Sequence, residues 1–175
     1  MDPIKEALTF DDVTLAPKYS SVLPSEVNTS VKLSKNLNLK IPLLSSAMDT
    51  VTESKMAIEI AKAGGIGVIH RNLSISDQLI EIKKVQKKGL AVGAAVGTND
   101  TEIFRAEKII KSKVDLIVVD TAHGHTKRVA DIIKFIKRKK SSKTSLCAGN
   151  IATAEAAKFL CKLGVDIVKV GIGPG

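Results

Sequence analysis

Six short apolar segments alternate with segments of helical spacing from residue 41 onward, and this alternation limits the fold more than any other feature. The apolar segments are rich in small and β-branched residues, which is typical of buried strands. They are Pro42–Met48, Ile66–His70, Ala91–Gly97, Leu116–Asp120, Ser145–Gly149 and Ile167–Gly171. Repeated strand–helix units require a parallel sheet with right-handed crossovers. The sequence therefore predicts an α/β protein.

The segments between these strands repeat their apolar side chains every three or four residues, as amphipathic helices do. Ser74 with Asp77 three residues later predicts a helix-starting capping box. Gly64, Gly89 and Gly164 stand where helices are expected to end. The predicted helices are Thr52–Ala63, Ile75–Lys88, Asp100–Lys111, Thr126–Lys139 and Thr153–Leu163.

Six strands and five helices fit either an open doubly wound sheet or most of an eight-stranded barrel. No G-x-G-x-x-G follows the first strand, so the dinucleotide fingerprint of the open sheet is missing. The small residues of Ala91–Gly97 suit a crowded barrel interior. A whole barrel takes about 200 to 250 residues, so we predict a TIM (β/α)8 barrel with about six of its eight strands present.

The first 40 residues do not follow the alternating pattern. Residues 1–40 are predicted to form an N-terminal extension of short strands and turns, placed in Leu8–Pro17 and Val27–Leu39. Residues 41–175 are predicted to form the incomplete (β/α)8 barrel.

Composition argues against several classes of function. The formal charge is +9, but only 3% of residues are aromatic and the lysines fall on helix faces and ends, so nucleic acid is not an expected partner. Cys147 and Cys161 have no CxxC spacing, as in a reduced cytosolic protein. No apolar run approaches the roughly 20 residues that span a bilayer. Residues 1–20 lack the apolar centre of a signal peptide, so a cytoplasmic protein without a membrane partner is expected.

Polar side chains cluster where the predicted strands end, which is where β/α barrels carry their active sites. The opposite strand ends carry nothing comparable. Glycines in the last segment let the backbone approach a ligand, and its N–H or C=O groups can then hold a phosphate or a cation, although a tight turn explains them equally well. The clustered residues are Ser45, Ser46, Met48, Asp49, His70, Arg71, Asn72, Asp120, Thr121, His123, His125, Asn150 and Gly171–Gly175.

Some of these residues permit other chemistry. Asp120–His125, with His70, suggests a metal site, but no further ligand is anchored elsewhere, and Asp120 can bind ribose hydroxyls without a metal. Lys169 lies in an apolar strand and suggests either a Schiff-base lysine or a paired structural one, of which we favour the second. Nothing adjacent to Cys147 would lower its pKa, so core packing is favoured over a nucleophilic role.

Six motifs, in this order, resemble IMP dehydrogenase and cover nearly the whole chain: ALTFDDVTLAP, IPLLSSAMDTVTE, GGIGVIHRN, VDTAHGH, AGNIAT and VKVGIGPG. GMP reductase shares the barrel and a similar glycine-rich turn. Its members tend to carry Asn in place of Ala47 and Asn-Gly in place of His123-Gly124. The motifs SSAMDT and DTAHGH therefore favour the dehydrogenase.

The resemblance implies NAD-dependent oxidation of IMP to XMP, the committed step of guanine nucleotide synthesis, through a covalent cysteine intermediate. It implies that Ser46 and Met48 contact IMP, and on the predicted strand their spacing puts both side chains on one face. The other implied substrate-binding residues are Asn150 and Gly171, between IMP and the nicotinamide. The residues implied to bind NAD are Asp120, Thr121, Ala122, Asn150 and Gly171.

The resemblance further implies a potassium ion held by the carbonyl groups of Gly173 and Gly175, and a homotetramer. The catalytic cysteine of the family lies three residues beyond the position of Gly175, so this chain is expected to hold no catalytic residue and to be inactive alone. Most members insert two CBS regulatory modules where Lys87–Ala91 joins helix to strand directly, so the CBS domain is expected to be absent. The alternatives are GMP reductase and a nucleotide-binding half-barrel without catalysis.

Overall fold

The computed structural model describes residue 6 and residues 8–172. Its centre is one parallel sheet of six strands, which lie in sequence order with a helix between each pair of neighbours. The strands are β3 (Leu44–Ser45), β4 (Ile66–Ile69), β5 (Val92–Val96), β6 (Leu116–Asp120), β7 (Ser145–Ile151) and β8 (Ile167–Val170). The helices are α1 (Ser54–Lys62), α2 (Ile75–Gln86), α3 (Asp100–Lys111), α4 (Lys127–Lys139) and α5 (Ala154–Leu163).

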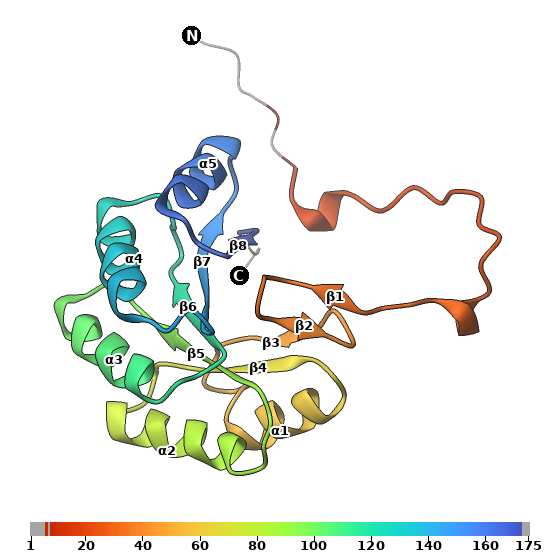
Figure 1. Cartoon of the computed structure of the whole chain (residues 1–175). Coiled ribbons are helices and arrows are strands. Elements are labelled where there is room, and N and C mark those ends of the chain that lie inside the picture. The colour runs from red at the N-terminus through yellow and green to blue at the C-terminus, as the bar shows by residue number, and fades with distance from the viewer. Residues whose placement is uncertain (1–5, 7, 173–175) are drawn as a thin grey trace, which may run out of the picture.

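The sheet is curved, and helices α1 to α5 lie along its outer side (Figure 1). Every pair of adjacent strands is parallel, from β3–β4 to β7–β8. This arrangement is that of a partial TIM barrel, so the predicted fold class is confirmed. No helix in the described part of the chain is long and apolar enough to cross a membrane.

Alternate residues of the strands build two separate cores. In β6, Ile117 and Val119 pack under the helices, whereas Leu116 and Val118 face the inside of the curve. Successive side chains of a strand point to opposite faces, and both faces are apolar here because both are covered. The sequence reads as continuous apolar runs for this reason.

A two-stranded hairpin covers part of the inner face. Its strands are β1 (Val31–Lys32) and β2 (Asn38–Leu39), which pair antiparallel. Leu37 and Leu39 are buried in the inner core, and each contributes roughly 2 kcal/mol by leaving water. The Ser34 hydroxyl lies 2.7 Å from that of Ser145, which begins β7. The hairpin therefore lies at the amino-terminal ends of the strands.

The helix boundaries follow the signals in the sequence. Gly64, Gly89 and Gly164 all have positive φ angles, of 99°, 69° and 75°, so the predicted glycine stops are confirmed. The hydroxyl of Ser74 caps α2 by accepting from the N–H of Asp77 at 3.1 Å. The reciprocal bond of a capping box does not form, because Asp77 Oδ2 accepts from the Ser74 hydroxyl at 2.6 Å instead.

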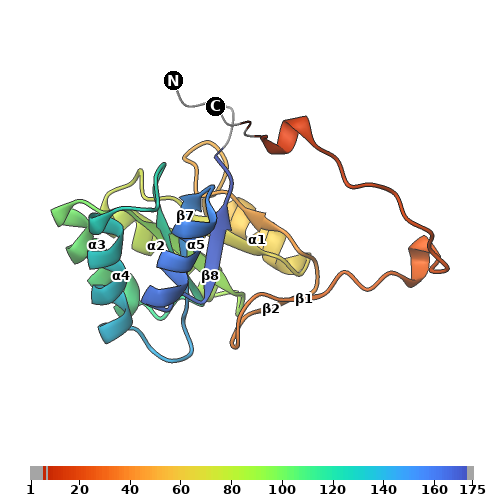
Figure 2. The same cartoon turned by 90° about the horizontal axis from the view of Figure 1, so that it is seen from above.

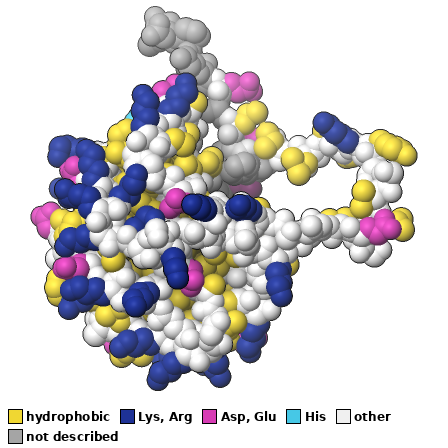
Figure 3. Space-filling model, in the orientation of Figure 1, with side chains coloured by type: hydrophobic (Ala, Val, Ile, Leu, Met, Phe, Trp, Pro, Cys, Tyr) yellow, Lys and Arg dark blue, Asp and Glu magenta, His cyan; other side chains and the backbone are white. Residues whose placement is uncertain are grey.

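The amino-terminal segment differs from the prediction. Between residues 8 and 17 the chain forms a 3-10 turn, Phe10–Asp12, and no strand. The N–H of Thr9 donates to Asp12 Oδ2 at 2.7 Å, and this local bond starts the turn. A second turn, Pro24–Glu26, follows, and the segment extends away from the sheet (Figures 1 and 2). Apolar side chains are exposed along it (Figure 3), including Leu15 at 94% and Tyr19 at 96%.

Candidate functional site

A cavity of about 280 Å³ lies on the inner side of the curved sheet. Side chains from β3, β4, β6, β7 and β8 line it, so residues far apart in the sequence meet there. Its lining is apolar except for a few groups near the carboxyl ends of the strands. The polar and sulfur-bearing residues are Ser45, Ser46, Asp120, Cys147 and Lys169, and the apolar residues are Leu33, Leu44, Ala47, Val68, Val118, Ile167 and Val168.

Asp120 and Lys169 form an ion pair in this cavity. The Nζ of Lys169 donates to Asp120 Oδ1 at 2.7 Å, and the two side chains are 41% and 23% exposed. Asp120 pairs with Gly149 on β7, and Gly149 pairs with Lys169 on β8, so the register brings the charges together across one intervening strand. This pair was not predicted from the sequence, although both residues line the cavity from inward-facing positions of their strands.

The close packing of these strands depends on Gly149. A Cβ at this position would collide with the carbonyl oxygen and the Cβ of Lys169. Only glycine therefore lets β7 and β8 lie this close beside the ion pair.

The residues that follow β6, β7 and β8 are joined by hydrogen bonds. The N–H and hydroxyl of Thr121 donate to the Gly149 carbonyl at 2.9 and 3.0 Å, and the N–H of Asn150 donates to the Thr121 carbonyl at 2.7 Å. The side-chain amide of Asn150 donates to the Gly171 carbonyl at 2.7 Å. Ala122 is exposed next to Thr121. Four residues predicted to bind NAD, Asp120, Thr121, Asn150 and Gly171, therefore lie at one rim.

Ser46 and Met48 do not share a strand face, so the geometric argument made for them is wrong. Strand β3 ends at Ser45. The N–H of Met48 and the hydroxyl of Thr52 both donate to the Ser46 carbonyl, at 2.9 and 2.5 Å, and the chain turns there. Ser46 lines the cavity, whereas Met48 is 55% exposed and lies outside its lining.

The histidines do not form a metal site with Asp120. His70 is buried, with Nδ1 accepting from the N–H of Asn72 at 3.1 Å and Nε2 lying 3.6 Å from Glu53. The ring of His125 packs against Phe159, with 4.7 Å between centroids. Among residue 6 and residues 8–172, no three His, Cys, Asp or Glu side chains are placed to hold a metal ion. The predicted potassium ligands Gly173 and Gly175 lie outside the described residues.

The structure supports the less reactive interpretation of Lys169 and Cys147. The ammonium group of Lys169 is engaged by Asp120, whereas a Schiff base needs a neutral amine that can attack a carbonyl group. Cys147 is 5% exposed, and burial raises the pKa of its thiol to about 12 although the nearby Lys169 lowers it. The thiolate is the nucleophilic form, so Cys147 is a packing residue.

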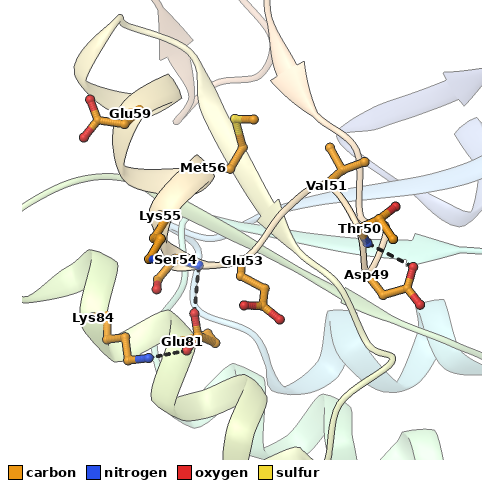
Figure 4. A pocket seen from close by; sticks show the side chains of 10 residues that line it. All are labelled: Asp49, Thr50, Val51, Glu53, Ser54, Lys55, Met56, Glu59, Glu81 and Lys84. Carbon is orange, nitrogen blue, oxygen red and sulfur yellow. Dashed lines mark hydrogen bonds and ion pairs between the residues drawn. The ribbon is translucent and has the colours of Figure 1, made fainter.

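A second pocket, of about 540 Å³, lies at the amino-terminal end of α1. It includes Asp49 of the clustered polar residues but none of the residues predicted to bind IMP, NAD or potassium. Glu81 of α2 accepts from the N–H of Ser54 at 2.8 Å and pairs with Lys84 (Figure 4). Burial raises the pKa of Glu81, but the bonds from Lys84 and Ser54 together outweigh it and leave the pKa below its ordinary value. These charges join α1 to α2, so the pocket is explained by helix packing.

Comparison with known proteins points to one family. Residues 7–175 match the model of the IMP dehydrogenase / GMP reductase domain. The chain is 45% identical to an inosine-5'-monophosphate dehydrogenase of Borreliella burgdorferi, 40% identical to one of Cryptosporidium parvum and 32% identical to one of Aquifex aeolicus. Each alignment covers 98% of this chain.

The chain spans only part of these relatives. It covers 54% of the Borreliella protein, 53% of the Cryptosporidium protein and 61% of the Aquifex protein. The Aquifex alignment runs over 300 positions, although this chain has 175 residues. That relative therefore carries a stretch within the aligned region that has no counterpart here.

Proposed function

The chain belongs to the IMP dehydrogenase / GMP reductase family, and from this premise we propose that the complete protein oxidises IMP to XMP with NAD. Overall, IMP, NAD and water would give XMP, NADH and a proton. The observation that carries the proposal is the meeting of Ser46, Asp120, Asn150 and Gly171 at the carboxyl-end rim of one sheet. Barrel enzymes bind their substrates at this rim.

The residues present fit a dinucleotide. Asp120 uses one carboxylate oxygen for Lys169, and Oδ2 makes no hydrogen bond within the described residues. A carboxylate oxygen at a half-buried rim is a suitable acceptor for the hydroxyls of a ribose. When bound, NAD supplies the hydride acceptor. Asp120 would hold the ribose, beside Thr121 and Ala122, while Asn150 fixes the turn at Gly171.

For the nucleotide substrate, we propose Ser46 as a contact at the rim, with Met48 beside it on the same turn. Asn150 and Gly171 are proposed to contact IMP on the side that faces the nicotinamide. Ser46 lines the cavity and is exposed, so its hydroxyl is accessible to a ligand. Cys147 is unsuited to form the covalent intermediate, because its thiol is buried and its pKa is about 12. From the resemblance to the family, we propose that the nucleophile is a cysteine of the complete protein beyond Gly175.

Further features of the proposal rest on family membership. Potassium is proposed to bind the carbonyl groups of Gly173 and Gly175. We propose that the stretch missing relative to the Aquifex protein is the pair of CBS modules, with Lys87–Ala91 as the direct connection between α2 and β5. A homotetramer and a cytoplasmic location complete the proposal.

The test is a spectrophotometric assay of the complete protein with IMP, NAD and potassium. We expect NADH absorbance to rise, and we expect Asp120→Asn to raise the KM for NAD about tenfold while the KM for IMP changes little. Activity with GMP and NADPH instead would identify a reductase. Nucleotide binding without turnover of either substrate would favour the non-catalytic half-barrel.

A further inference from the structure

The ion pair between Lys169 and Asp120 lies at an unusual position in the fold. It joins strands β6 and β8 across β7, its partners are 49 positions apart in the sequence, and it lies inside a mostly apolar cavity. Its Nζ–Oδ1 distance is 2.7 Å. The two side chains remain 41% and 23% exposed, and ion pairs that water still reaches contribute little to stability, so stability alone does not explain the position of the pair.

The ion pair engages only one of the two carboxylate oxygens of Asp120. Lys169 engages Oδ1 of Asp120 only, and Oδ2 has no hydrogen-bond donor among the described residues. The backbone next to both partners of the ion pair is also fixed. Thr121 donates hydrogen bonds to the Gly149 carbonyl, and Gly149 packs against Lys169. The Asp120 carboxylate is therefore held through Oδ1, and Oδ2 remains available to accept a hydrogen bond.

We propose that Lys169 is a positioning residue, which orients the Asp120 carboxylate so that Oδ2 accepts hydrogen bonds from the ribose hydroxyls of the dinucleotide. This inference rests on the proposed function. The hydrogen bond from the ammonium group holds Oδ1 in place, so the carboxylate presents Oδ2 in a fixed orientation. Lys169 itself touches neither reacting atom in this role.

The experiment measures NAD binding directly, by isothermal titration calorimetry on the complete protein, beside the KM and kcat values. We expect Lys169→Met to weaken NAD binding about tenfold and to leave IMP binding within about twofold. Lys169→Arg keeps a cation within reach and should restore most of the affinity. Lys139→Met is the matched control, since Lys139 is 47% exposed and pairs with Glu107 at the far end of α4.

A double-mutant cycle separates positioning from a general loss of stability. If Lys169 acts through Asp120, Lys169→Met should have no further effect on NAD affinity in the Asp120→Asn background. Additive losses would overturn the proposal, as would wild-type affinity in Lys169→Met. If Lys169→Met fails to fold, Lys169→Arg decides: near-wild-type affinity supports the proposal, and affinity as weak as that of Asp120→Asn overturns it.

The proposed function and this inference fail in different ways. A wild-type protein that neither binds NAD nor oxidises IMP contradicts the proposed function, and the role of Lys169 falls with it. A wild-type protein that does both, with an unchanged Lys169→Met variant, contradicts the role of Lys169 alone.

Discussion

Burial determines the chemistry of the two cysteines. Cys147 lies inside the curved sheet at 5% exposure, whereas Cys161 is exposed on α5. An apolar surrounding disfavours the thiolate more than the thiol, which is why the pKa of Cys147 rises from 9.0 to about 12. The same residue type is therefore inert at one position and accessible at the other.

This difference predicts the labelling of the native chain by Ellman's reagent. At pH 8, about one Cys147 thiol in ten thousand would be ionised, so we expect one fast-reacting thiol per chain, and two after denaturation. The reactivity of Cys147 should rise about tenfold for each pH unit and level off only near pH 12. Cys161→Ser should remove the fast reaction. Equal rates for both cysteines in the folded chain would contradict the assignment.

For single residues, the sequence predicted where polar side chains gather but not which hydrogen bonds and ion pairs hold each of them. Asp120 and Asn150 could be placed together because the carboxyl ends of parallel strands meet at one edge. The turn at Ser46 was missed because it depends on the Thr52 hydroxyl, which no strand pattern reveals. The partner of Asp120 was missed because it depends on the register of three strands.

Between elements, a buried polar network joins α2 and α3 to the sheet. Arg105 of α3 donates to Glu102 at 2.9 Å, to Gln78 of α2 at 2.8 Å and to the Leu73 carbonyl at 3.0 Å. Gln78 donates to the Ala95 carbonyl of β5 at 2.9 Å, and Glu102 accepts from the N–H of Gly97 at 2.6 Å. The network thus fixes the loops after β4 and β5, on the side of the rim.

Removing one member should destabilise the chain strongly. Arg105→Met leaves Glu102 and Gln78 buried without their partner, and we expect unfolding in urea to show a loss of about 3 to 5 kcal/mol. Glu107→Gln is the control, because Glu107 pairs with Lys139 at the surface, where water screens the pair and its loss should cost far less. Similar losses for the two variants would show that burial of the network contributes little.

The helices could be predicted to within two residues at every boundary, because their signals are local: a helical period in each, and a glycine after α1, α2 and α5. Strand β3 was predicted as Pro42–Met48 but covers only Leu44–Ser45, since a strand ends where its partner does. The segment before residue 18 was predicted to contain short strands from its apolar residues. It forms none, because no neighbouring strand within the described residues pairs with it.

As a whole, the described structure presents apolar surface on two strand edges. Strands β3 and β8 are the outermost strands of the sheet, and each has neighbours on one side only. Leu44 of β3 is 39% exposed and Val170 of β8 is 59% exposed. Edge strands with unpaired backbone groups and apolar side chains favour pairing with another chain.

The 175-residue chain by itself should therefore self-associate. We expect sedimentation velocity to show oligomers that increase with concentration, since pairing at either edge satisfies backbone groups and buries Leu44 or Val170. Val170→Lys should weaken the association, because it places a charge on an edge that would have to be buried. Ile103→Lys is the matched control, since Ile103 is 44% exposed on α3, away from both edges. A chain that sediments as one species at all concentrations, with or without Val170→Lys, would mean that the edges do not drive association.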